Sequence, residues 1–96
     1  MKKKINCEVN IPVTIFKEAK YYVAYSPALD LSTSAKTFSK VKERFSEIVA
    51  IFIEELVKKG TIDEVLESHG WKKEKEKYLP PVMISQQIEK FCIAAK

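Results

Sequence analysis

The feature that most constrains the fold is an apolar stripe in the middle of the chain, which recurs at steps of three and four residues. This period matches one side of an α-helix, and charged residues occupy the opposite side. Thr37 is the expected N-cap, with Ser39 as the alternative, and Gly60 is the expected C-terminal cap. The sequence therefore predicts a long amphipathic helix that covers another apolar layer. The stripe consists of Phe38, Val41, Phe45, Ile48, Val49, Phe52, Ile53 and Leu56.

Short alternating segments precede this helix and predict the layer that it covers. Residues 5–11 alternate strictly between apolar and polar, which is typical of a half-buried strand. Pro12 lacks an N–H and is expected to interrupt the hydrogen-bond ladder, and "KEAK" is expected to be the turn of a hairpin. The predicted strands are residues 5–11 with a continuation over 13–16, residues 21–26, and a short third strand over 29–32.

After the long helix, Thr61 and Glu64 have the spacing of a capping box, which predicts a short helix through Ser68 that ends at Gly70. Trp71 is expected to pack on the core, and "KKEKEK" is expected to be a charged loop. Alternation over residues 88–93 predicts a closing strand. The fold class is thus α+β: a three-stranded antiparallel sheet covered on one face by a long helix, then a short helix and a C-terminal strand, in a single domain over residues 1–96.

Composition narrows the class of protein. The chain has 96 residues and is 46% apolar, enough for one folded domain, and its net charge of +4 is modest. No apolar run approaches the roughly 18–20 residues that span a bilayer, so a cytoplasmic protein is expected. Cys7 and Cys92 each lie in an alternating apolar pattern, which favours two reduced core thiols over a disulfide or a metal pair.

Residues that could carry catalysis are sparse. His69 is the only histidine, and its place at a helix end favours capping or packing over catalysis. Two distant cysteines do not supply the clustered ligands of a zinc site. The two glycines, Gly60 and Gly70, are both expected at helix ends, so no phosphate-binding loop is predicted. We therefore expect a binding protein that is not an enzyme and uses no cofactor and no metal.

The second predicted strand indicates where binding could occur. Tyr22, Ala24 and Ser26 share one face, and their mostly smaller side chains suit close packing against the helix. The other face then exposes an aromatic row, and a sheet with one uncovered face invites a partner. Ordinary cross-strand packing of surface aromatics is an equally good interpretation. The row consists of Tyr21, Val23 and Tyr25.

The segment from Tyr21 to Gly60 resembles the HicB-like antitoxin family of type II toxin–antitoxin systems. The resemblance lies in the strand residues 22–24, Pro27 at the strand end, Leu29 as apolar anchor, and Thr37 at the start of the helix. Ala35 and Lys36 stand where the family motif has Gly and Asp. The resemblance implies a β-β-β-α core similar to a reduced ribonuclease H fold without its catalytic carboxylates.

In that family, the domain covers a small toxin that cleaves messenger RNA. The resemblance thus implies a small basic toxin as the partner of this chain. Many members add an operator-binding module after this domain, and no such module is recognisable after Gly70. The residues expected to bind the partner are Tyr21, Val23 and Tyr25 as apolar anchors, with Asp30, Glu43 and Glu47 facing its basic surface.

Two alternatives remain open at this point. The chain could be a solitary HicB-like protein that forms a homo-oligomer, with its C-terminal segment crossing to a second copy. It could instead bind nucleic acid through Lys2, Lys3 and Lys4 together with "KKEKEK", although interleaved glutamates weaken that interpretation. The residues expected to form a homodimer are Val82, Ile84, Ile88, Phe91 and Ile93.

Overall fold

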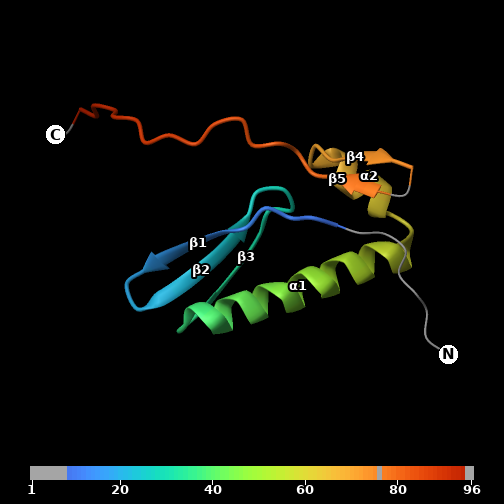
Figure 1. Cartoon of the computed structure of the whole chain (residues 1–96), viewed down its shortest axis with the longest axis horizontal. Coiled ribbons are helices and arrows are strands. Elements are labelled where there is room, and N and C mark those ends of the chain that lie inside the picture. Colours follow the sequence, from blue (N-terminus) through green and yellow to red (C-terminus); the bar gives the residue numbers. More distant parts are fainter. Residues whose placement is uncertain (1–8, 76, 95–96) are drawn as a thin grey trace.

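Three strands, two helices and a short hairpin follow one another in a computed structural model, which describes residues 9–75 and 77–94 (Figure 1). The α+β class and the order of the sheet, the long helix and the short helix are confirmed, and the C-terminal strand occurs as a strand pair. The elements are β1 (Thr14–Glu18), β2 (Tyr21–Ser26), β3 (Leu31–Ala35), α1 (Phe38–Lys59), α2 (Ile62–Ser68), β4 (Lys72–Glu74) and β5 (Lys77–Leu79).

The three-stranded sheet has the order β1-β2-β3, and both pairs of neighbours are antiparallel. Ala24 in the central strand lies opposite Ile15 on one side and Thr33 on the other. A turn at residues 19–20 joins β1 to β2, and it places Ala19 in the left-handed region with φ 51°. The hairpin therefore forms without glycine, at some cost in backbone strain at Ala19.

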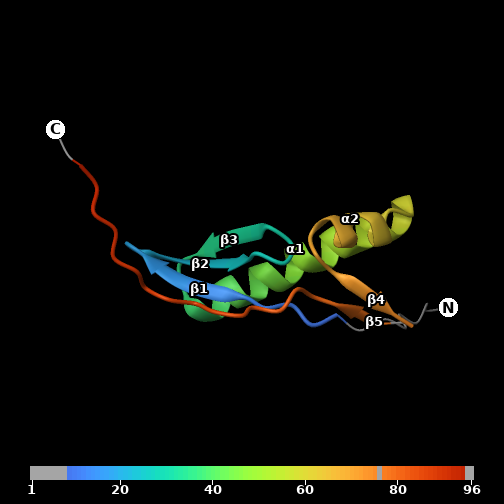
Figure 2. The same ribbon diagram turned by 90° about the horizontal axis from the view of Figure 1, so that it is seen from above.

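Helix α1 covers one face of this sheet (Figures 1 and 2). Its N-terminus is capped as predicted, because the Thr37 Oγ1 accepts the Lys40 backbone N–H at 3.0 Å. Gly60 ends the helix in the left-handed conformation, with φ 69°, which confirms the predicted C-terminal cap.

The core has two parts. The first lies between the sheet and α1 and contains the buried side chains of Ala24, Ala35, Val41 and Phe45. The second joins the β2–β3 turn to α2 and the β4–β5 hairpin. Trp71 is buried there as predicted, and its Nε1–H donates to the Ala28 carbonyl oxygen at 2.8 Å. The buried residues of this second cluster are Ala28, Leu29, Leu66, Trp71 and Tyr78.

The third strand begins later than the predicted residues 29–32. Leu29 is buried in the second core cluster, and Asp30 adopts the left-handed conformation with φ 55°, so both belong to the turn before β3. The Ser/Thr-rich corner forms the strand instead, because Leu29 is held by contacts from α2 and the hairpin that alternation along the chain does not reveal.

The predicted capping box at α2 is wrong. Thr61 has φ −115° and ψ 12°, outside extended geometry, and its side chain makes no capping hydrogen bond in the described part of the chain. The helix itself forms over Ile62–Ser68, and its backbone begins with the Val65 N–H donating to the Thr61 carbonyl oxygen at 3.0 Å.

The segment "KKEKEK" is not the predicted loop, because Lys72–Glu74 form β4 and Lys77 begins β5. Burial of Tyr78 on one side of β5 explains why so charged a segment pairs. Residues 88–93 are not the predicted strand: they have no regular structure and no neighbouring strand among the described residues. Of the first predicted strand, residues 5–8 lie outside the described residues, and Val9 makes only an isolated parallel bridge to Tyr78.

Neither described helix has the length and apolar character that crossing a membrane requires.

Candidate functional site

The face of the sheet opposite α1 carries the predicted aromatic row. Ala24 and Ser26 are fully buried beneath α1, whereas Tyr21 is 46% exposed, so the predicted assignment of the two faces of β2 is confirmed. Cross-strand register places further residues beside the row. We call this surface the open face. It consists of Thr14, Phe16, Glu18, Tyr21, Val23, Tyr25, Ser32 and Ser34.

Phe16 belongs to this surface, although the sequence did not assign it there. It lies opposite Val23 and is 47% exposed, about as much as Tyr21. The signal that could have found it is the hairpin register, since residues directly opposite each other in an antiparallel pair point to the same face. Together Phe16, Tyr21 and Val23 make an apolar strip across β1 and β2.

The charges that the strands themselves place on the open face are acidic, whereas Lys36, Lys40 and Arg44 lie beside its Tyr21 end. Glu18 lies opposite Tyr21, and Asp30 accepts a hydrogen bond from the Tyr25 hydroxyl at 3.4 Å. The only basic residue in the three strands is Lys17, which points to the helix side, with its ammonium 5.2 Å from the centre of the Tyr22 ring. The open face thus joins exposed aromatic side chains to two carboxylates.

Glu43 and Glu47 do not join this surface. Both are exposed residues of α1, which covers the opposite face of the sheet, and Glu43 forms an ion pair with Lys40 at 3.5 Å. The predicted partner-binding set is therefore divided. The structure brings together Tyr21, Val23, Tyr25 and Asp30, and it leaves the two glutamates on another side of the molecule.

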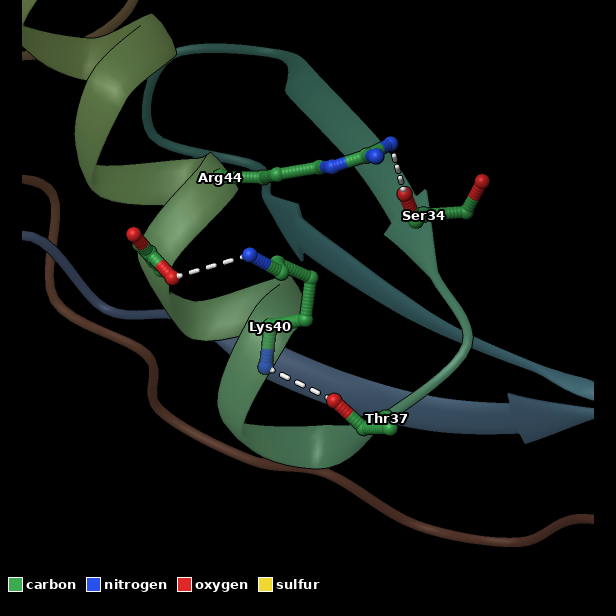
Figure 3. A network of polar contacts seen from close by, with 5 residues as sticks. Ser34, Thr37, Lys40 and Arg44 are labelled. Atoms are coloured by element: carbon green, nitrogen blue, oxygen red, sulfur yellow. Dashed lines mark hydrogen bonds and ion pairs between the residues drawn. The ribbon is translucent and has the colours of Figure 1, made fainter.

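A polar network links the start of α1 to the outer edge of β3 (Figure 3). The Arg44 guanidinium donates to the Ser34 carbonyl oxygen at 3.2 Å, a backbone group on the side of β3 away from β2. Lys36, Lys40 and Arg44 line a pocket of about 420 Å³ together with Tyr21 and Ser34 of the open face. Arg44 thereby satisfies a backbone acceptor on one edge of the sheet, which protects that edge from pairing with another strand.

A second pocket, of about 540 Å³, lies between α2 and the hairpin. At its wall, the Tyr78 hydroxyl donates to the Asp63 carboxylate at 2.6 Å, and the Lys73 ammonium lies 3.5 Å from the same carboxylate. The hydrogen bond from Tyr78, and then the charge of Lys73, hold the pKa of Asp63 below its usual value of 3.8. This trio ties the hairpin to α2 and contains no paired nucleophile and base.

The remaining sequence candidates have structural roles or lie elsewhere. His69 is the C-cap residue of α2, and its Nδ1 lies 2.9 Å from the Val65 carbonyl oxygen, which confirms the capping role. Cys92 is exposed, so the prediction that it is a core thiol is wrong, and Cys7 lies outside the described residues. Over the described ranges, no group of histidine, cysteine and acidic residues is placed to hold a metal ion.

The five predicted dimerisation residues lie in an extended C-terminal segment, residues 80–94, which we call the tail. Its described residues form no helix and no strand. All five apolar side chains project into solvent, with exposed fractions of 79% for Val82, 90% for Ile84, 104% for Ile88, 77% for Phe91 and 86% for Ile93.

The lysines considered for nucleic-acid binding are described only in part. Lys2, Lys3 and Lys4 lie outside the described residues. In the hairpin, Lys73 is engaged with Asp63 and lies 5.4 Å from the centre of the Tyr78 ring.

Comparison with known proteins finds no match among family models, curated proteins or solved structures. The resemblance to HicB-like antitoxins therefore stays a prediction that rests on the residues quoted above.

Proposed function

We propose that this chain is a non-enzymatic binding protein, similar to a HicB-family antitoxin, that binds and blocks a small basic, messenger-RNA-cleaving toxin through its open face. The proposal assigns the chain to the cytoplasm, where such a toxin meets its substrate. It rests on one observation above all: Phe16 and Tyr21 are exposed to 47% and 46% on a sheet face that no described element covers.

The charge of this face favours a basic partner. Glu18 and Asp30 flank the aromatic residues, and the three strands place no lysine or arginine on this side. A lysine- or arginine-rich surface could pair with both carboxylates and stack cations on the tyrosine rings. The basic residues nearest this face, Lys36, Lys40 and Arg44, gather at its Tyr21 end.

The test is capture of the partner from lysate of the native cell with the tagged full-length chain, followed by purification of the captured protein. A small basic protein recovered in near-equal amount, with ribonuclease activity that the chain inhibits, is the expected result. Recovery of the chain alone, or of a partner whose activity is unaffected, would overturn the proposal.

Substitutions then assign the surface. Tyr21→Ala is expected to weaken binding by about 30-fold, the typical effect of losing an aromatic interface anchor. Tyr21 is half exposed, so its loss leaves the core intact. Glu47→Gln on α1 is the matched control and is expected to bind like the unmodified chain. Equal weakening by both variants would remove the open face from the interface.

A homo-oligomer without a toxin is the second candidate function. The exposed apolar side chains of the tail favour such a homo-oligomer.

A further inference from the structure

One edge of the sheet, at β1, has no neighbouring strand among the described residues. The strand order places β1 at an edge, with β2 as its only neighbour among the described strands. The other edge, at β3, is protected by the Arg44 guanidinium on the Ser34 carbonyl oxygen. No described side chain makes a comparable hydrogen bond to β1. An unprotected edge strand is a template for pairing with another extended segment.

An apolar hollow lies alongside that edge. It has a volume of about 330 Å³ and is formed between β1 and the first half of α1. Its wall is mostly apolar, with Val13, Ile15, Phe38 and Phe45, and also includes Lys42 and Ser46. Val13 is 42% exposed and Phe38 is 51% exposed, so the hollow opens to solvent beside β1. A strand added to β1 would direct every second side chain into this space.

The tail has the complementary properties. It extends away from the hairpin past the sheet and does not pair with it (Figures 1 and 2). In an extended conformation, Val82, Ile84 and Ile88 share one side, because their numbers differ by multiples of two. Ile84 and Ile88 are exposed to 90% and 104%, which is costly for large aliphatic side chains in water.

We propose that two copies of this chain exchange their tails, and that residues 82–88 of each copy add to β1 of the other as a fourth strand. Main-chain hydrogen bonds to β1 would give affinity, and the hollow would receive side chains from the side that Val82, Ile84 and Ile88 share. Every copy contains both the free edge and the apolar segment. A two-fold exchange therefore satisfies both at once, whereas a foreign strand would leave the tail exposed. Phe91 and Ile93 fall on the other side of the extended segment and are not assigned to the hollow.

The anchors Tyr21, Val23 and Tyr25 lie on β2, whereas the exchanged tail would pair with the backbone of β1 and place Ile84 on the helix side of the sheet. The experiments can therefore disprove the dimer without disproving the proposed partner binding. They can equally disprove partner binding without disproving the dimer.

The experiment measures the oligomeric state of the full chain by sedimentation and light scattering over a range of concentrations. The unmodified chain is expected to be a dimer. Ile84→Asp is expected to weaken the dimer by about 30-fold or more, since it places a charge in the hollow. Ser85→Asp is the matched control: it adds the same charge on the opposite side of the same segment and is expected to remain dimeric. A monomeric unmodified chain, or a dimer unaffected by Ile84→Asp, would overturn the proposal.

A mixing experiment separates exchange between copies from folding of the tail onto its own β1. Val13→Asp damages the hollow, and Ile84→Asp damages the tail, so each variant alone is expected to be monomeric. Both positions are substantially exposed, so both variants are expected to fold. When they are mixed, one intact tail meets one intact hollow, and a heterodimer is expected. Failure of the mixture to dimerise would contradict exchange of tails.

Discussion

Ser26 places a polar hydroxyl in an apolar part of the core. It is fully buried on the helix side of β2, and its hydroxyl has no hydrogen-bond partner among the described residues. Most buried polar side chains are paired, and leaving one unpaired costs about 1–3 kcal/mol.

Ser26→Ala is therefore expected to stabilise the protein by about 1 kcal/mol, because it removes the unpaired hydroxyl and little volume. Chemical denaturation followed by circular dichroism measures this change. The matched variant Ala24→Ser introduces a second hydroxyl into the same buried face and is expected to destabilise. A loss of stability on Ser26→Ala would show that the hydroxyl has a partner.

Asp63 provides a pH-dependent contribution to stability. The Tyr78 hydroxyl, and then Lys73, hold the pKa of Asp63 in the folded state below its usual value of 3.8. A carboxyl with a lowered folded-state pKa stabilises the protein above its unfolded-state pKa, and this contribution is lost as the pH falls through the folded-state value.

Tyr78→Phe is expected to raise the pKa of Asp63, as measured by NMR titration of the carboxyl carbon. It should also lower the free energy of unfolding at neutral pH, and the difference from the unmodified chain should shrink as the pH falls below about 4. Asp63→Asn is the control, since it should abolish the pH-dependent part. A pKa unchanged by Tyr78→Phe would exclude this hydrogen bond as the main cause.

At the scale of elements, the two helices begin differently although both follow a threonine. Thr37 has extended geometry, with φ −131° and ψ 157°, and its side chain caps α1, whereas the Thr61 side chain makes no capping bond to α2. The backbone of Thr61 is constrained by the preceding cap, since its N–H donates to the Leu56 carbonyl oxygen at 3.0 Å.

Thr37→Ala is accordingly expected to destabilise the protein by about 1 kcal/mol, the usual value of an N-cap side chain. Thr61→Ala is its matched control and is expected to change stability by less than about 0.5 kcal/mol. Thermal or chemical unfolding of the two variants tests the contrast. Equal losses would mean that Thr61 also acts as a cap.

At the scale of the whole molecule, stability depends on joining two core clusters that lie along one long helix. Val49 of α1 packs against both clusters. Trp71 joins the hairpin segment to the β2–β3 turn through its hydrogen bond to Ala28, across 43 residues of sequence. The turn, α2 and the hairpin are therefore expected to unfold together.

Trp71→Phe is expected to cost about 2 kcal/mol, because it leaves the Ala28 carbonyl oxygen buried without its donor. Circular dichroism is the appropriate measurement, since Trp71 is the only tryptophan and its removal ends the fluorescence signal. Phe16→Leu on the open face is the control and should have little effect. Similar stability of the two variants would show that this hydrogen bond does not hold the hairpin segment to the β2–β3 turn.

The candidate site was only partly predictable. Alternation placed Tyr21, Val23 and Tyr25 on one face, because period two along a strand is a local property. The separation of Glu43 from that face could not be predicted, since the side of the sheet that α1 covers is fixed by packing between distant segments. Phe16 joined the face through pairing with β2, which alternation in β1 alone does not specify.

The sequence by itself determined α1, its two caps and the extent of β2. These features depend on residues a few positions apart, whose side chains and backbone groups interact within one turn or one strand. Tertiary structure decided where β3 begins, which side of the sheet α1 covers, that a charged segment pairs as a hairpin, and that the tail pairs with no described strand of its own chain. Strands need hydrogen-bond partners from elsewhere in the chain. The burial of residues such as Leu29 and Tyr78 depends on contacts with segments that are distant in the sequence.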